Sequence, residues 1–307
     1  KSWCVLHLSK LHNYANAFIS WPKYTVSESK IMCGIFGHFS SILMFEKKGF
    51  QAPLLAAQKA LHHRGPDDQG LLTENVAGGT LSLGHTRLSI IDLSTAGYKP
   101  MYSCDGRLSI IFNGEIYNYR ELRIELKSLG HEFQTETDTE VLLAAWAEWE
   151  ENCLAKLIGM FAFVVFDRRL KTLSCVRDAF GIKPFYYRHS AGELQFASEV
   201  PALLAMWGGP PQPNWQRAYD YLVWGRYDDQ KTTFYEEVKH LLPGHWFRFS
   251  LERPQVIETK RWWWPSIEER TDLSFTQAAE QLREIFLESV RLHMRSDVPI
   301  GAALSGG

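Results

Sequence analysis

Short apolar segments follow one another from residue 161 to residue 197, and short turns rather than crossover helices separate them. Successive strands of a parallel sheet need a crossover connection of a dozen or more residues, whereas antiparallel strands do not. The chain is therefore predicted to be an α+β protein with mostly antiparallel sheets covered by helices. After a first strand in MCGIFGHFS at residues 32–40, the expected strands are 81–91, 108–113, 161–166, 172–177, 185–187 and 194–197.

Two capping boxes mark expected helix starts. Thr137 and Glu140 match the first, which places Asp138 at the N-terminus of a helix. Ser274 and Gln277 match the second, ahead of an amphipathic helix. Two further helices are predicted from a proline start and from an asparagine cap, at residues 53–61 and 118–130.

Proline and glycine cluster in GGPPQP at residues 208–213, which favours a domain boundary there. We divide the chain into an extension at 1–32, a first domain at 33–210, and a connecting segment with the truncated start of a second domain at 211–307. Translation is expected to start at Met32, so that the extension is an untranslated stretch, a cloning scar or a misassigned start. A processed leader is the alternative.

Charge and composition exclude several functional classes. The 33 basic and 35 acidic residues give a net charge of -2, which offers no electrostatic reason to expect nucleic acid or an anionic membrane as a partner. No apolar run approaches the roughly 20 residues of a membrane-spanning helix. The five cysteines show no paired spacing typical of disulfide or zinc sites, so we expect a reducing, cytoplasmic location and assign no metal.

Cys33 directly follows Met32 and precedes Gly34. Removal of Met32 would give Cys33 a free α-amine, and such amines have a pKa of about 7.7 to 8.0. Near neutral pH this amine can act as a base toward the thiol of its own residue, without a separate histidine. The alternative is a small buried cysteine on a first strand, which the tripeptide alone favours.

Four more positions carry groups suited to an amino-acid substrate. The forked guanidinium of Arg87 can hold a carboxylate, although contact with solvent is the commoner role of a strand arginine. The Asn113 amide and the Gly114 N–H could both donate to one oxygen as an oxyanion hole, although the dipeptide alone favours a turn that ends a strand. Asp138 could pair with an ammonium group or simply cap a helix.

Eight segments follow one another in an order and spacing specific to one family. They are MCGIFG, HHRGPDDQG, GHTRLSIIDLS, FNGEIYNYREL, TDTEVLLAAW, GMFAFVVFD, RDAFGIKPFYY and ASEVPALL. In this order they resemble the glutamine-hydrolysing asparagine synthetases. The resemblance implies a class II glutamine amidotransferase domain, an N-terminal-nucleophile hydrolase with a four-layer αββα fold and two antiparallel sheets. It also implies a following α/β ATP-pyrophosphatase-type domain, truncated in this chain.

The same resemblance implies roles for individual positions. Cys33 matches the nucleophile with its own amine as general base, Asn113 and Gly114 match the oxyanion hole, and Arg87 matches the residue that holds the glutamine carboxylate. The other positions implied for glutamine binding are Leu88, Ser89, Ile90, Ile91, Glu115 and Asp138. The positions that match the ATP loop are Leu304, Ser305, Gly306 and Gly307.

The implied reaction is attack of Cys33 on the side-chain amide of glutamine, release of ammonia, and hydrolysis of the thioester to glutamate. In such enzymes the second domain uses ATP and Mg²⁺ to adenylate aspartate, and ammonia converts the adenylate to asparagine. The resemblance therefore implies a carbon-nitrogen ligase with glutamine, aspartate and ATP as substrates. No cofactor is expected for the glutaminase domain, and a homodimer is left open.

The chain departs from the family pattern at two points, and two alternative functions stay open. The residues ahead of Cys33 would block its amine, so the chain as written should be inactive until trimmed, and the ATP loop is incomplete. One alternative is a related amidotransferase that passes ammonia to a sugar or peptide carboxylate. The other is a non-catalytic binding protein of the same fold, which a buried Cys33 without a pocket would favour.

Overall fold

The computed structural model describes residues 32–44, 49–94, 97–98, 100–190, 192–227 and 229–301. The expectations for residues 1–31 and for the ATP-loop positions Leu304, Ser305, Gly306 and Gly307 lie outside the described residues.

Six antiparallel strands form the first sheet, in the order β10-β8-β9-β1-β3-β2. Strand β1 lies between β3 and β9, with Gly34 opposite Thr86 and Phe36 opposite Ala197. Cys33, the residue before β1, therefore lies at the end of an inner strand. The strands are β1 (Gly34–Ser40), β2 (Asp68–Val76), β3 (Gly79–Arg87), β8 (Tyr186–Ser190), β9 (Glu193–Ala197) and β10 (Lys239–His240).

Six antiparallel strands also form the second sheet, in the order β12-β11-β7-β6-β5-β4. Its long central pair joins β5 to β6, with Asn113 opposite Ala162 and Gly114 opposite Phe161. The strands are β4 (Met101–Tyr102), β5 (Leu108–Ile116), β6 (Gly159–Asp167), β7 (Thr172–Arg177), β11 (His245–Ser250) and β12 (Thr259–Arg261).

Three apolar clusters join the two sheets to each other and to the helices on their outer faces. Ile35 and Phe39 of the first sheet share a fully buried cluster with Val164 and Phe166 of the second, because period-2 alternation points them at one another. A second cluster joins the other face of the first sheet to α2 (Gln51–Ala60) and α5 (Val200–Met206). A third joins the second sheet to α3 (Tyr119–Ser128) and α4 (Asp138–Trp149). This is the predicted αββα arrangement.

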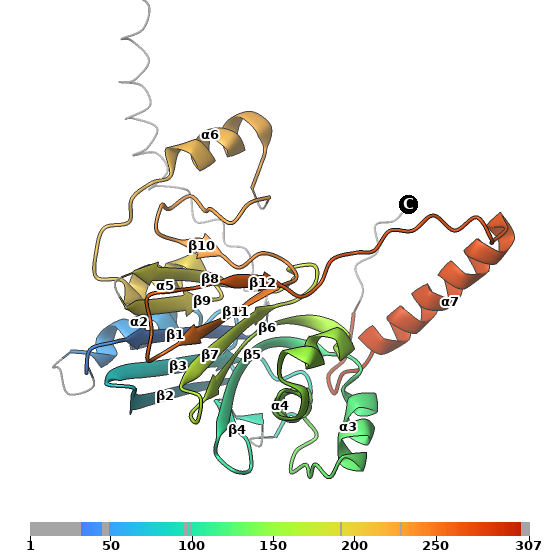
Figure 1. Cartoon of the computed structure of the whole chain (residues 1–307), viewed down its shortest axis with the longest axis horizontal. Coiled ribbons are helices and arrows are strands. Elements are labelled where there is room, and N and C mark those ends of the chain that lie inside the picture. Colours follow the sequence, from blue (N-terminus) through green and yellow to red (C-terminus); the bar gives the residue numbers. More distant parts are fainter. Residues whose placement is uncertain are drawn as a thin grey trace, which may run out of the picture.

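Three further helical segments complete the described chain. They are the 3₁₀ helix η3 (Glu150–Lys156), α6 (Trp215–Trp224) and α7 (Phe275–His293). Figure 1 shows α7 extending away from the two sheets, and its apolar residues Leu282, Ile285 and Phe286 are exposed. Within the described residues, no helix is both long and apolar enough to cross a membrane.

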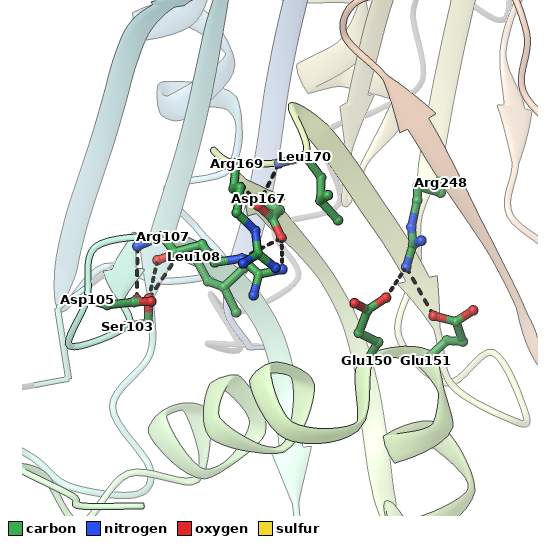
Figure 2. A network of polar contacts seen from close by, with 10 residues as sticks. All are labelled: Ser103, Asp105, Arg107, Leu108, Glu150, Glu151, Asp167, Arg169, Leu170 and Arg248. Atoms are coloured by element: carbon green, nitrogen blue, oxygen red, sulfur yellow. Dashed lines mark hydrogen bonds and ion pairs between the residues drawn. The ribbon is translucent and has the colours of Figure 1, made fainter.

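Polar contacts tie the second sheet to the helical layer beside it (Figure 2). The Arg107 side chain donates from Nε to Asp167 at 2.9 Å, which joins the start of β5 to the end of β6. Arg248 on β11 donates to Glu150 and Glu151 of η3, at 3.0 Å each. Because Arg248 is partly exposed, we expect these two ion pairs to contribute modestly to stability.

The structure confirms two local predictions and corrects three. Helices begin at both predicted caps, where Ser274 and Gln277 bond reciprocally and Thr137 accepts a hydrogen bond from the Glu140 amide. The Glu140 carboxylate, however, accepts the amides of residues 134 and 135 instead of the Thr137 amide, so the first capping box forms only in half. The strand expected at 81–91 ends at Arg87, so that residues 88–91 form a loop. The Asn113-Gly114 dipeptide does not end its strand, which continues to Ile116. Asn118 directs its side chain to residues 156 and 158 rather than capping its helix.

Strands beyond the expected boundary at 208–213 complete both sheets. β10 pairs with β8 in the first sheet, and β11 pairs with β7 in the second. Sequence reasoning also missed β2, because its pattern of burial is irregular. The division of the chain near residue 210 stays a prediction, but the segment after it contributes to the same two sheets.

Phe196→Ala tests the packing between the sheets. The Phe196 ring is fully buried, stacks on Phe185 with 5.5 Å between ring centroids, and fills the space beside Gly37, where a built Cβ would lie 2.2 Å from the ring. Truncation leaves a cavity, so we expect the free energy of unfolding to fall by about 3 to 5 kcal/mol in urea titrations. Phe275→Ala, at a side chain that is 90% exposed, should change it by less than about 0.5 kcal/mol. Equal effects would contradict this packing.

Candidate functional site

A pocket opens where the start of β1, next to Cys33, faces β5 and the start of α4. It holds about 430 Å³ of space that no atom fills, part of it open to solvent. Of the expected glutamine-site residues, Ser89 and Asn113 do not line it. The lining residues are Met32, Cys33, Arg87, Leu88, Ile90, Ile91, Gly97, Gly114, Glu115, Thr137, Asp138 and Thr139.

Cys33 is held at both its side chain and its backbone. The Sγ atom lies 3.4 Å from the Leu88 amide nitrogen and 3.5 Å from the Leu88 carbonyl oxygen. The Cys33 carbonyl accepts a hydrogen bond from Arg64 Nε at 3.0 Å, and Arg64 in turn donates to Glu199 at 2.7 Å. The Met32 amide donates to the Arg64 carbonyl at 3.3 Å. The thiol is thus fixed at the pocket wall rather than packed in a core.

Asn113 and Gly114 reach the site from the second sheet. Asn113 is fully buried, and its Nδ2 atom lies 3.4 Å from Ser198 Oγ, a long hydrogen bond. The same hydroxyl accepts the Ile35 amide at 3.0 Å and so links β5 to β1. Gly114 has φ +157°, and a Cβ there would lie 2.1 Å from the Met160 carbonyl oxygen. Only glycine therefore fits between β6 and the pocket.

Arg87 organises the loop that follows β3. Its guanidinium donates to the carbonyl of Ser94 at 2.8 Å and to the carbonyl of Asp92. Asp92 has φ +55°, a strained conformation for a non-glycine residue. Burial raises the pKa of the Asp92 carboxyl, but hydrogen bonds from Ser94 and Glu136 outweigh it, so that the pKa lies below its usual value. The carboxylate therefore stays charged and holds the loop.

Two carboxyl groups, those of Asp138 and Glu115, line the pocket. Asp138, in the first turn of α4, accepts the Ile116 amide at 2.9 Å and a hydrogen bond from Thr139. Burial and the nearby Asp138 raise the pKa of Glu115, while Lys183 and His293 oppose this shift. These acidic groups make the site suitable for a substrate that carries an ammonium group.

Sequence reasoning missed Lys183, although it quoted the RDAFGIKPFYY segment that contains it. The Asp178 carboxylate accepts backbone N–H groups from Phe180, Ile182 and Lys183, at 2.9 to 3.0 Å, and closes a tight turn. This turn buries the Lys183 side chain, whose Nζ contacts Met32 Sδ. Burial lowers the pKa of Lys183 to about 8, with Glu115 opposing the shift. A loop lysine gives no sequence signal for such burial.

Among the described residues, no group of three or more histidine, cysteine, aspartate or glutamate side chains could hold a metal ion. The two acids that line the pocket are Glu115 and Asp138, and the Asp138 carboxylate accepts the Ile116 amide.

Lys183→Met tests the burial of this lysine. The unfolded chain holds the lysine proton up to pH about 10.5, whereas the folded chain releases it above about 8, so the lysine makes stability rise with pH between these values. The rise should amount to about 3 kcal/mol in the wild type. Urea unfolding at several pH values should show a flatter dependence in Lys183→Met. Lys171→Met, at an exposed lysine, should keep the wild-type slope; an unchanged slope in both would contradict the assignment.

Two family models match the chain. The model described as "Glutamine amidotransferase domain" matches residues 32–263, which include the described pocket residues and both sheets. The model described as "Asparagine synthase" matches residues 281–307, from within α7 onward.

Several proteins are similar over most of the chain. It is 33% identical over 296 residues to putative asparagine synthetase [glutamine-hydrolyzing] 2 of Methanocaldococcus jannaschii, with 90% of this chain and 55% of the relative covered. It is 34% identical over 276 residues to asparagine synthetase [glutamine-hydrolyzing] 1 of Bacillus subtilis, covering 90% and 42%. Amidase chyE of Penicillium rubens is 34% identical over 251 residues, covering 80% and 35%. The chain thus spans 35 to 55% of the length of these relatives.

Solved structures with this fold include glutamine phosphoribosylpyrophosphate amidotransferase from B. subtilis, complexed with ADP and GMP. Its TM-score is 0.52 at 19% identity, over 75% of this chain and 49% of that one. A structure titled as the allosteric regulatory enzyme of purine biosynthesis matches with a TM-score of 0.52 at 18% identity. Similarity at this identity supports the fold alone. It confirms the predicted fold, in which two antiparallel sheets lie between helical layers.

Proposed function

The chain belongs to the glutamine amidotransferase domain family, and from this premise we propose that it is a glutaminase with Cys33 as its N-terminal nucleophile. The observation that supports the proposal is the convergence of Cys33, Arg87, Gly114 and Asp138 on one pocket, from four separate elements. A pocket at the thiol also weighs against the non-catalytic alternative.

Glutamine would bind between the charged groups of the pocket. Arg87 donates two hydrogen bonds to loop carbonyls, and since a guanidinium has five N–H donors, others are left for the substrate carboxylate. Asp138 and Glu115 would face the ammonium group. This orientation would place the side-chain amide toward the Cys33 thiol.

The chemistry would proceed in two steps. The Cys33 thiol gives its proton to the α-amine, the sulfur attacks the amide carbon, and the oxyanion accepts hydrogen bonds from the Asn113 Nδ2 and Gly114 N–H groups. The amine returns the proton to the leaving nitrogen, so that ammonia departs and a thioester forms. Water, deprotonated by the same amine, then attacks the thioester, which releases glutamate and restores the thiol.

Removal of Met32 is required because the peptide bond to Cys33 leaves no basic amine. Lys183 contacts the Met32 side chain, so its ammonium lies beside the position where the new α-amine would form. Like charges disfavour each other, and Lys183 would therefore keep that amine in its neutral, basic form near neutral pH. Glu115 balances the charge of Lys183 within the same site.

For the full-length protein we propose ATP-dependent amidation of aspartate to asparagine in the cytoplasm, with Mg²⁺ as the metal for ATP. The match of residues 281–307 to an asparagine synthase model and the names of two relatives support this acceptor. The ATP-loop positions lie outside the described residues, so no step is derived through ATP, and a homodimer stays a prediction.

A different acceptor is the second candidate, and the similarity to amidase chyE favours it. Aspartate-dependent release of pyrophosphate by the full-length protein would distinguish the two. Release that requires aspartate supports asparagine synthesis, whereas ATP use with another carboxylate supports the alternative.

Cys33→Ala tests the nucleophile. The chain starting at Met32, with removal of this methionine checked by mass spectrometry, should release glutamate from glutamine. Cys33→Ala should abolish the release because no thioester can form. Cys104→Ala, at an exposed cysteine, is the matched control and should keep wild-type activity. Glutamate release by a trimmed, folded Cys33→Ala protein would contradict the proposal.

Asn113→Ala tests the oxyanion hole. Loss of one donor to the oxyanion should lower kcat for glutamate release by about 100- to 1,000-fold, with a much smaller change in KM. Asn75→Ala, near the end of β2 and outside the pocket, should leave kcat unchanged. Thermal melts of both variants separate folding from catalysis, and a folded Asn113→Ala protein with wild-type kcat would contradict the assignment.

A further inference from the structure

The chain segment just after α7 returns to the pocket and bonds to its loop. The Asp297 carboxylate accepts the Asp92 amide N–H at 2.8 Å, and the Asp297 amide donates to the Ile90 carbonyl at 3.0 Å. These two bonds hold the backbone of residues 90–92. Ile90 itself lines the pocket.

Arg295 fixes this segment to the first domain. Its buried guanidinium donates to the Tyr117 carbonyl at 2.6 Å and to both oxygens of Glu121, at 2.5 and 2.6 Å. The hydrogen bond from Arg295 is the largest cause that lowers the pKa of Glu121, to about 2. The His293 ring also contacts the Tyr117 ring, with 4.0 Å between centroids. The segment is therefore anchored at the end of β5 and on α3.

The loop depends on such external bonds. Residues 88–92 have no strand partner, and Asp92 adopts a strained positive φ. Arg87 holds the Asp92 carbonyl, the Asp92 carboxylate accepts the Glu136 amide at 3.2 Å, and Asp297 holds the Asp92 amide. Strain of this kind persists only where the surroundings fix it. Loss of one of the three contacts should therefore loosen the wall that Leu88 and Ile90 present.

We propose that Asp297 and Arg295 are positioning residues for the glutamine pocket, so that the segment matched by the asparagine synthase model controls how tightly the first domain binds glutamine. This inference rests on the proposed glutaminase function. The segment after α7 can thus affect the pocket, because movement of residues 295–297 releases the backbone of Asp92 and Ile90. Glutamine binding in turn favours the attached position of the segment by the same free energy.

The first experiment needs no catalysis. Hydrogen–deuterium exchange of the whole chain should show faster exchange of peptides covering residues 88–94 in Asp297→Ala than in the wild type. Arg295→Met should have the same effect although it does not contact the loop, because it frees the segment that carries Asp297. Glu288→Gln, which breaks an exposed ion pair with Arg291 on the same helix, is the matched control and should leave the loop unchanged.

The second experiment separates binding from chemistry. In chains trimmed to Cys33, Asp297→Ala should raise KM for glutamine about three- to tenfold, the range that loss of one hydrogen bond predicts, with kcat within about twofold of the wild type. Arg295→Lys, which keeps the charge and part of the hydrogen bonding, should recover part of the KM change produced by Arg295→Met. Glu288→Gln should keep the wild-type KM.

The outcomes are distinguishable. Wild-type exchange at residues 88–94 and wild-type KM in a folded Asp297→Ala protein would overturn the inference. If Asp297→Ala unfolds, the same measurements on Asp297→Asn, which retains one carbonyl acceptor, decide between support and rejection. Absence of glutaminase activity in the trimmed wild type would reject the proposed function instead, and exchange at the loop would then still decide whether the segment holds it.

Discussion

The face-to-face packing of the two antiparallel sheets determines the position of every group at the pocket. Cys33 begins a strand of the first sheet, whereas Asn113 and Gly114 belong to the second. The Ser198 hydroxyl joins them, since it accepts the Ile35 amide and lies within hydrogen-bond distance of the Asn113 amide. Because the sheets share one densely packed apolar interior, a shift of either sheet would move the Cys33 thiol relative to Asn113 and Gly114.

The charges of the site are balanced over short distances in a largely buried setting. Arg87 bonds to loop carbonyls and lines the pocket. Asp138 and Glu115 also line it and provide negative charge. Lys183 lies between Glu115 and the residue that precedes the nucleophile. An environment that disfavours extra positive charge suits an amine that must act as a base, so fold and proposed mechanism require the same arrangement.

The segment after α7 gives the pocket a connection to the rest of the chain. Arg295 bonds to Glu121 and to the backbone of Tyr117, and Asp297 bonds to the loop that covers the thiol. The loop is therefore held both by the domain that contains it and by residues about 200 positions later. Such a contact lets a change in one part of the protein alter the affinity of another without touching the catalytic groups.

The sequence by itself determined the antiparallel α+β class, the two capped helix starts and most of the residues that line the pocket, because periodicity, capping and motif order can be read along the chain. It failed where the outcome depends on distant neighbours. Gly114 continues its strand because β6 lies against it. Residues 88–91 leave the sheet because Arg87 bonds to the carbonyls of Asp92 and Ser94, which follow them. The Asn118 side chain bonds to residues 156 and 158. Burial of Lys183 and the contact of Asp297 with the loop also required the tertiary structure, because both arise from residues brought together only by folding.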